Sequence, residues 1–198
     1  MNSTQKNSLF LKSDSKSDEL WQNMQQELAR AVHDKKHPFR LAVLGSQKQE
    51  GIGLRYIVLR ELSKAGSMLF YTDARSPKVA ELQQKPASSL LFYHPQKALQ
   101  IRVTGKMLIH QKDSLCKEHW KRIQGIVRRA YTPHIQPGTV IENPEAAHVW
   151  PEDMTDEYFA ILEFIPDSFD LLQLNRLEHL RLEFRKKKED WEVNWLAP

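Results

Sequence analysis

The fold of this chain is decided by residues 55–102, which contain RYIVLREL (55–62), FYTDARSPK (70–78) and LLFYHPQKALQIR (90–102). The three pieces are rich in β-branched, aromatic and leucine side chains, which is typical of short strands. Arg, Lys, Ser, Thr and Gln recur where these runs end. Such groups bind phosphate and hydrogen-bond polar atoms of a ring, so the stretch predicts a site for a phosphate-bearing planar ligand.

Strand-like runs continue on both sides of this stretch. We expect strands at 39–46, 55–62, 67–72, 88–94 and 98–109, and again at 158–165, 169–174, 180–185 and 191–196. So many short strands in one chain favour a small antiparallel barrel that carries its helices at the rim.

Three helices are expected around the strands. The first begins at Ser17 or Asp18, carries one apolar stripe and ends before Pro38. The second is short, at 79–85, with the Ser76 side chain capping a free N–H and Pro77 in the first turn. The third follows apolar residues spaced from Leu115 to Ala130, and residues 132–157, with four prolines, should form a long loop.

Composition fits one ordinary domain. The chain has 198 residues, 40% of them hydrophobic and 27% charged, which suffices for one core but is cramped for two. We expect a disordered or loosely ordered leader at 1–17 and a single domain at 18–198. The net charge of +4 comes from 29 basic and 25 acidic residues, a mixture that does not establish nucleic-acid binding.

Cysteine content and hydropathy indicate the compartment. Cys116 is the single cysteine, so no internal disulfide can form, and it reads as a packing residue rather than a nucleophile. No apolar run reaches the roughly 18 residues that span a bilayer. We expect a cytoplasmic protein without a membrane partner.

Several residues in the decisive stretch are candidates for binding an anion. Arg55 and Arg60 are five apart on one strand, so they should face opposite sides unless a bulge intervenes. Ser76 and Lys78 lie at a helix start, where free N–H groups favour an anion. Gln100 shares its strand face with an arginine, Arg102. The alternatives are ordinary surface arginines and a simple helix cap with a solvated lysine.

Other motifs in the sequence give less information about function. Gly51 to Gly53 (GIG) lacks a third glycine and leads into a strand, which excludes a dinucleotide loop. His33 and His37 have the spacing of a helical metal pair, but no further ligand is evident, so we expect surface histidines and no metal. A basic and aromatic stretch could bind nucleic acid, although a solvated helix face is the favoured interpretation. Its residues are Trp120, Lys121, Arg122, Arg128, Arg129 and Tyr131.

Taken in order, these motifs resemble the pyridoxamine 5'-phosphate oxidase family, and in particular its divergent flavin-binding relatives. The resemblance covers about residues 18–198. It is carried by RYIVLR, FYTDARSPK, KPASSLLFY, LQIRVTG, the helix around Trp120, the tail from Phe159 to Trp191 and the terminal LAP. It implies a mainly β (α+β) fold, an antiparallel split β-barrel of the FMN-binding type with peripheral helices, which forms a homodimer with FMN at the subunit interface.

The resemblance also implies site residues. The phosphate would be held by Ser76 and Lys78, and the ring would be reached by Gln100. Arg181 would add a contact near the C-terminal end, and Gln136 is a weaker match to a flavin-contacting glutamine. The full set of implied cofactor-binding residues is Arg55, Tyr56, Ile57, Val58, Arg60, Tyr71, Thr72, Ser76, Lys78, Gln100 and Arg181. Arg60 and His179 are the substrate-binding candidates, and His179 is the candidate for proton transfer because an imidazole titrates near neutral pH.

Departures from the family pattern limit the activity that is implied. Pro77 replaces an arginine of the phosphate turn, a tryptophan expected near Leu171 or Leu172 is absent, and the Arg-x-His substrate pair is reduced to Leu177 and His179. We therefore expect an FMN-dependent oxidoreductase acting on an unidentified small substrate, with an anionic one as an open option. The alternatives are a non-catalytic flavin carrier or sensor and, less favoured, a true pyridoxamine 5'-phosphate oxidase. A deazaflavin or haem in place of FMN also stays open.

Overall fold

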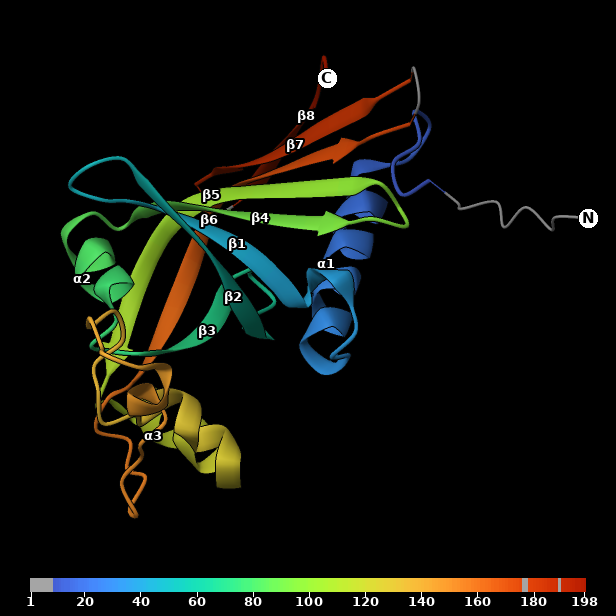
Figure 1. Cartoon of the computed structure of the whole chain (residues 1–198). Helices are drawn as coiled ribbons and strands as arrows, with labels where there is room; N and C mark the ends of the chain where they lie inside the picture. Colours follow the sequence, from blue (N-terminus) through green and yellow to red (C-terminus); the bar gives the residue numbers. More distant parts are fainter. Residues whose placement is uncertain (1–8, 176–177, 189) are drawn as a thin grey trace, which may run out of the picture.

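The computed structural model describes residues 9–175, 178–188 and 190–198. Its strands are β1 (Leu41–Gln47), β2 (Ile52–Leu62), β3 (Met68–Asp73), β4 (Ala87–His94), β5 (Leu99–Gln111), β6 (Phe159–Gln173), β7 (Leu180–Lys187) and β8 (Asp190–Leu196). The α-helices are α1 (Ser17–His33), α2 (Pro77–Gln84) and α3 (Ser114–Arg122), and three 3-10 helices are η1 (Pro38–Arg40), η2 (Gly125–Tyr131) and η3 (Pro144–Ala147). Figure 1 shows α1 and α2 on opposite sides of the strands.

The strands form one antiparallel sheet that closes on itself. Their order is β3-β2-β1-β4-β5-β6-β7-β8, and an additional pairing of β3 with β6 closes the first six into a barrel. β7 and β8 continue from β6 outside the closed part. The expected split antiparallel β-barrel with peripheral helices is confirmed.

β6 makes the split because its two halves have different partners. Residues 159–164 pair with β3, whereas residues 168–173 pair with β7, and β5 runs along both halves. The prediction of two separate strands at 158–165 and 169–174 is therefore wrong. Pro166 and Asp167, which lie between the two expected strands, are at a register shift opposite Thr104 and Gly105 that does not end the strand.

The core fills the barrel and extends under α1. Leu20, Met24, Leu28 and Ala31 recur at helical spacing and are buried against the sheet. Trp21, on the flank of this stripe, packs edge-on against aromatic rings of β6 and β7 and contacts Trp191 of β8. The apolar stripe of α1 thus covers both the barrel and the added strands.

The described part of the expected leader contacts the body of the protein. Leu11 is fully buried, and its N–H and that of Phe10 donate to Oε1 of Gln173, at the end of β6. Residues 1–8 lie outside the described residues, so the expected leader stays a prediction there.

The third helix is shorter than its apolar spacing predicts. Asp113 accepts the N–H of Cys116 and so caps α3, which ends at Arg122. Gly125 has φ +57°, a conformation that interrupts helical geometry, and the chain then continues as η2. No described helix is long and apolar enough to cross a membrane.

Candidate functional site

A partly buried lysine surrounded by hydroxyl groups lies where β3 passes into α2. Nζ of Lys78 donates to Oγ1 of Thr72 at 2.9 Å and to Oγ of Ser76 at 2.6 Å. None of the ion pairs among the described residues includes Lys78. Burial lowers the pKa of Lys78, and the cation of Arg55 lowers it further. An ammonium has three donors, so one is left for an incoming anion.

Ser76 does not have the expected capping role. It precedes α2, and Pro77 is the first helical residue as predicted, but the Ser76 side chain accepts no bond from the helix N–H groups. Its hydroxyl instead accepts the Lys78 ammonium. The turn is therefore organised around Lys78; we call Thr72, Ser76 and Lys78 the hydroxyl–lysine cluster.

Arg55 reaches the same side of the barrel but is already paired. Its guanidinium donates to Oε2 of Glu81 at 2.8 Å, to the carbonyl of Gly53 at 3.1 Å and to the hydroxyl of Ser46. Sequence reasoning missed Glu81, since nothing in the sequence marks a helical glutamate as the partner of a strand arginine 26 residues earlier.

Another arginine, Arg75, precedes Ser76 directly and is held by other groups. It pairs with Asp73 at 2.6 Å and lies over the ring of Tyr158 at 3.8 Å. The long loop at 132–157 covers this turn, because Nε2 of Gln136 donates to the Arg75 carbonyl at 3.0 Å. The weaker candidate, Gln136, thus lies next to the hydroxyl–lysine cluster.

Arg60 lies at a register shift of β2 against β3, between Leu59 and Glu61, and its partners differ from those of Arg55. Its guanidinium is 5.3 Å from the ring centre of Tyr71 and donates to the Tyr131 hydroxyl at 3.3 Å, while its Nε is buried without a hydrogen-bond partner. Arg60, Tyr71 and Arg122 line two adjoining hollows of about 680 and 250 Å³.

Tyr71 links this hollow to a buried histidine that sequence reasoning also missed. The Tyr71 hydroxyl is 2.7 Å from Nδ1 of His119, which lies on α3 and is 1% exposed. Burial raises the pKa of Tyr71 and lowers the pKa of His119. Both groups are therefore neutral at pH 7 beside the charged Arg60.

A second group of candidate residues lies on the outer face of β5, β6 and β7. Asp170 pairs with Arg181 at 2.8 Å and also with Arg102. Burial opposes ionisation of Asp170, but the bonds from Arg181 and Arg102 outweigh it, so its pKa is lowered. Gln100 is opposite Leu172, and Leu172 is opposite Arg181. No bond among the described residues joins this group to the hydroxyl–lysine cluster.

The remaining candidates differ in accessibility. Tyr56 is 72% exposed, whereas Ile57 is in the core and Val58 is half-buried. His179 is exposed, and its Nδ1 accepts the N–H of Asn175 at 3.1 Å. Leu177, the other half of the expected substrate pair, lies outside the described residues.

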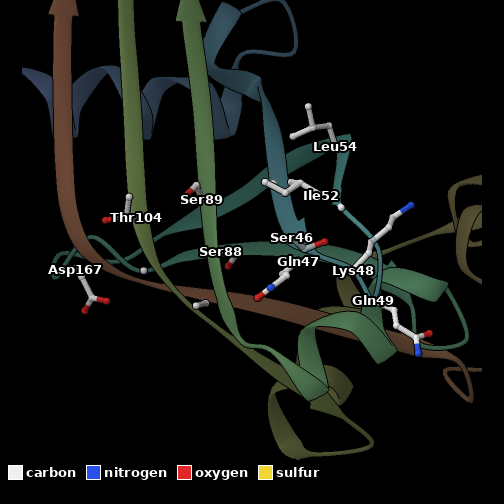
Figure 2. A pocket seen from close by; sticks show the side chains of 14 residues that line it. Ser46, Gln47, Lys48, Gln49, Ile52, Leu54, Ser88, Ser89, Thr104 and Asp167 are labelled. Atoms are coloured by element: carbon white, nitrogen blue, oxygen red, sulfur yellow. The ribbon is translucent and has the colours of Figure 1, made fainter.

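A hollow of about 860 Å³ runs along the outer face of the sheet. Figure 2 shows β4 and β5 contributing short side chains, Ser88, Ser89 and Thr104, between Asp167 on one side and the loop at 48–51 on the other. Ser46, which bonds to both Arg55 and Glu81, lies at its edge. The hollow is thus open to a flat ligand or to another protein surface.

A buried cluster of Glu27, His37 and His94 has the composition of a metal site, with ligand atoms within 4.8 Å of one another. However, Nδ1 of each imidazole accepts a backbone N–H, so its Nε2 carries the proton and is no metal ligand. Lys97 also pairs with Glu27 at 2.9 Å. The cluster is an internal ion-pair network, and His37 is not the surface histidine that was expected.

The basic residues near Trp120 are engaged within the protein. The guanidinium of Arg128 is 4.8 Å from the Trp120 ring centre, that of Arg129 is 4.7 Å from the Trp150 ring centre, and Arg122 pairs with Glu61 and Glu118. Cys116 is buried, and burial raises its pKa to about 11, as expected for a packing residue.

The strand pairing and the closure of β3 on β6 define a split-barrel protein. Residues 18–111 match the model of the pyridoxamine 5'-phosphate oxidase, FMN-binding domain. In sequence and fold the chain is similar to proteins of the pyridoxamine 5'-phosphate oxidase-like split-barrel family.

Two curated relatives show how far the similarity extends. A pyridoxine/pyridoxamine 5'-phosphate oxidase of Acinetobacter baumannii (strain SDF) is 27% identical over 184 residues, which cover 86% of this chain and 82% of the oxidase. The oxidase of Legionella pneumophila (strain Lens) is 33% identical over 76 residues. The latter match spans 38% of this chain and only about a third, 35%, of the Legionella protein.

Solved structures agree in fold. A pyridoxamine 5'-phosphate oxidase-related, FMN-binding protein from Nostoc punctiforme has a TM-score of 0.72 at 22% identity, covering 87% of this chain and 96% of its own. PhzG from Burkholderia lata, solved with tetrahydrophenazine-1-carboxylic acid, also has a TM-score of 0.72, at 19% identity, with 90% and 92% covered.

Proposed function

We propose that the protein binds FMN and is an oxidoreductase acting on a small, anionic substrate. The observation that carries the proposal is Lys78, a partly buried ammonium that contacts two hydroxyls and has no ion-pair partner among the described residues. A partly buried cation that bonds only to hydroxyls is costly, and a phosphate group would lower that cost.

The hydroxyl–lysine cluster fits the phosphate of FMN in its chemistry. A phosphate monoester offers three acceptor oxygens and about −1.5 to −2 charges at pH 7, and the cluster offers donors of matching kind. When bound, the flavin would supply the hydride chemistry, while the protein would orient it and keep out side reactions. Arg55, which acts electrostatically on Lys78, and Gln136, which bonds to the Arg75 carbonyl, are further candidates for contacts.

A homodimer would bring the second group of candidates to the cofactor. Gln100 and Arg181 lie on the outer face of the sheet, where large apolar side chains are also exposed. Tyr56 and Leu54 are each 72% exposed on β2, and Tyr93 is 47% exposed on β4. Exposed apolar surface of this kind favours burial against a second copy. We infer that each flavin lies between two subunits.

The substrate would bind beside Arg60. This arginine has no acidic partner among the described ion pairs, and the neutral Tyr71 and His119 adjoin it. An anionic group of the substrate would compensate its charge. The reduced pair at Leu177 and His179 and the proline at Pro77 argue against pyridoxamine 5'-phosphate as that substrate.

Replacing the lysine tests the cofactor proposal. We expect Lys78→Ala to weaken FMN binding about 10- to 100-fold, which corresponds to the loss of a charge-assisted hydrogen bond. Riboflavin, which lacks the phosphate, should bind the variant as it binds the unmodified protein. The control is Lys85→Ala, which removes an exposed lysine just after α2. Equal losses for FMN and riboflavin would contradict a phosphate role for Lys78.

A further inference from the structure

Glu81 pairs with Arg55, a cation that the phosphate of a ligand would otherwise contact. Its Oε2 accepts from the Ser46 hydroxyl at 2.7 Å and from the Arg55 guanidinium at 2.8 Å. The pair is partly buried, with side chains 21% exposed for Arg55 and 15% for Glu81. The Arg55 guanidinium also donates to the Gly53 carbonyl at 3.1 Å.

Glu81 and Lys78 share one face of α2, because they are three residues apart on the helix. The cation of Arg55 lowers the pKa of Lys78, and the carboxylate of Glu81 raises it. Asp73 also raises the pKa of Lys78, and Asp73 is itself paired with Arg75. The charges within the Arg55–Glu81 and Arg75–Asp73 pairs cancel, so Lys78 leaves a net charge of +1 to meet an incoming anion.

A phosphate monoester needs more positive charge than that. At pH 7 it carries about −1.5 to −2 charges, so this net charge falls short by nearly one charge while Glu81 is ionised. Burial opposes ionisation of Glu81, but the bonds from Ser46 and Arg55 outweigh it, and its pKa is lowered. The carboxylate is therefore charged at neutral pH and repels a second anion at this position.

We propose that Glu81 is a built-in competitor of the phosphate group: it neutralises Arg55 in the free protein and must release that arginine when a phosphate-bearing ligand binds. This inference rests on the proposed binding of FMN. Glu81 thereby sets the affinity for the phosphate-bearing cofactor and the preference for it over the phosphate-free form. This competitor role predicts that the cofactor is bound weakly enough to exchange with cofactor in solution.

The opposite role would be a positioning one, in which Glu81 holds Arg55 in the direction that the phosphate requires. The two roles predict opposite signs. A competitor limits FMN affinity, so its neutralisation tightens binding, whereas neutralising a positioning carboxylate loosens it.

The experiment is a fluorescence titration of Glu81→Gln with FMN and with riboflavin. Glutamine keeps an acceptor oxygen for Ser46 and Arg55 and removes the charge. We expect FMN to bind about tenfold more tightly, equivalent to about 1.4 kcal/mol, with riboflavin unchanged. The gain should shrink in a protein that also carries Arg55→Gln. Glu19→Gln, an exposed carboxylate on α1, is the matched control and should change nothing.

The outcomes separate this inference from the proposed function. If the unmodified protein binds FMN and Glu81→Gln binds it equally or more weakly, the competitor role is overturned while FMN binding stands. If tightening is the same for riboflavin, charge at the phosphate is not the cause and the inference also fails. If neither protein binds FMN, the proposed function and this inference fall together.

Discussion

Single residues decide what the site can bind, and here they differ mainly in how their charges are compensated. Lys78 has only hydroxyl partners, Arg55 has a carboxylate, and Arg60 has aromatic and phenolic neighbours. Uncompensated charge at partly buried positions is costly in a folded protein and is commonly retained for binding. The contrast between Lys78 and Arg55 is the basis for assigning them different roles toward one phosphate.

Buried histidines should make stability depend on pH. Burial and the cation of Lys97 lower the pKa of His94, so the folded protein takes up this proton less readily than the unfolded chain, in which a histidine titrates near about 6.5. His94 therefore lowers the free energy of unfolding as pH falls through and below about 6.5. In urea titrations at pH 7.5 and 5.5, His94→Gln should lose less stability than the unmodified protein.

Other histidines provide the comparison. His119 acts in the same direction as His94, whereas Asp113 and Glu163 raise the pKa of His110 against the effect of burial, so His110 stabilises the fold at lower pH. His33→Gln, at an exposed position, is the control. A pH dependence as steep in His94→Gln as in the unmodified protein would refute the role given to His94.

The alternation of side chains along a strand predicted part of the site. Arg55 and Arg60 have different partners, as alternation predicted, although a register shift between Leu59 and Glu61 interrupts that alternation at Arg60. Alternation could not predict that Glu81 pairs with Arg55 or that Tyr71 contacts His119, since those contacts depend on how α2 and α3 pack on the barrel. The Ser76 cap was wrong because the nearby Lys78 ammonium is a better donor to that hydroxyl than a backbone N–H.

Among the elements, β6 determines the architecture, because it closes the barrel with one half and carries β7 with the other. The change of partner occurs at the register shift beside Gly105. A Cβ placed on Gly105 would be 2.1 Å from the carbonyl oxygen of Ile165. Only glycine lets the two backbones approach this closely.

Substitution at this point should be severe. We expect Gly105→Ala to lower the free energy of unfolding by at least about 2 kcal/mol, because the obstacle is backbone and cannot move aside. Gly45→Ala in β1 is the control, since its Cβ would meet Leu54 at 3.5 Å and Ser89 at 3.7 Å, both ordinary contacts. Denaturant unfolding measures both changes. Equal, small effects would show that the close approach at Gly105 is unimportant.

Most elements could be predicted from the sequence, and the exceptions have local causes. The strands from 39 to 109 were found close to their observed bounds because each is flanked by turn residues. β6 was split in two at Pro166 and Asp167, which a bulge accommodates within one strand. The third helix was predicted to be too long because the apolar spacing continues past Gly125 into η2.

At the scale of the whole molecule, the outer face of the sheet is the surface that we expect a second copy of the chain to cover. It combines exposed apolar side chains on β1, β2 and β4 with the group around Asp170 on β5 to β7. We expect twice the chain mass of 23.2 kDa in sedimentation equilibrium at micromolar concentration. Tyr56→Glu should shift the protein toward the monomer, because a carboxylate would be buried without a partner.

The control for this prediction introduces a glutamate at an equally exposed apolar position on another element. Ile126→Glu changes a side chain that is 70% exposed on η2, compared with 72% for Tyr56, and should leave the dimer intact. A monomeric unmodified protein, or a dimer that Ile126→Glu disrupts and Tyr56→Glu does not, would argue for a different interface.

The measurement that tests the central claim most directly is an equilibrium titration of the unmodified, cofactor-free protein with FMN and, in parallel, with riboflavin. The hydroxyl–lysine cluster predicts saturable FMN binding at micromolar concentration and at least about tenfold weaker binding of riboflavin, the cost of losing a charge-assisted contact. No saturation by FMN, or equal affinity for the two flavins, would contradict the assignment of this cluster as a phosphate site.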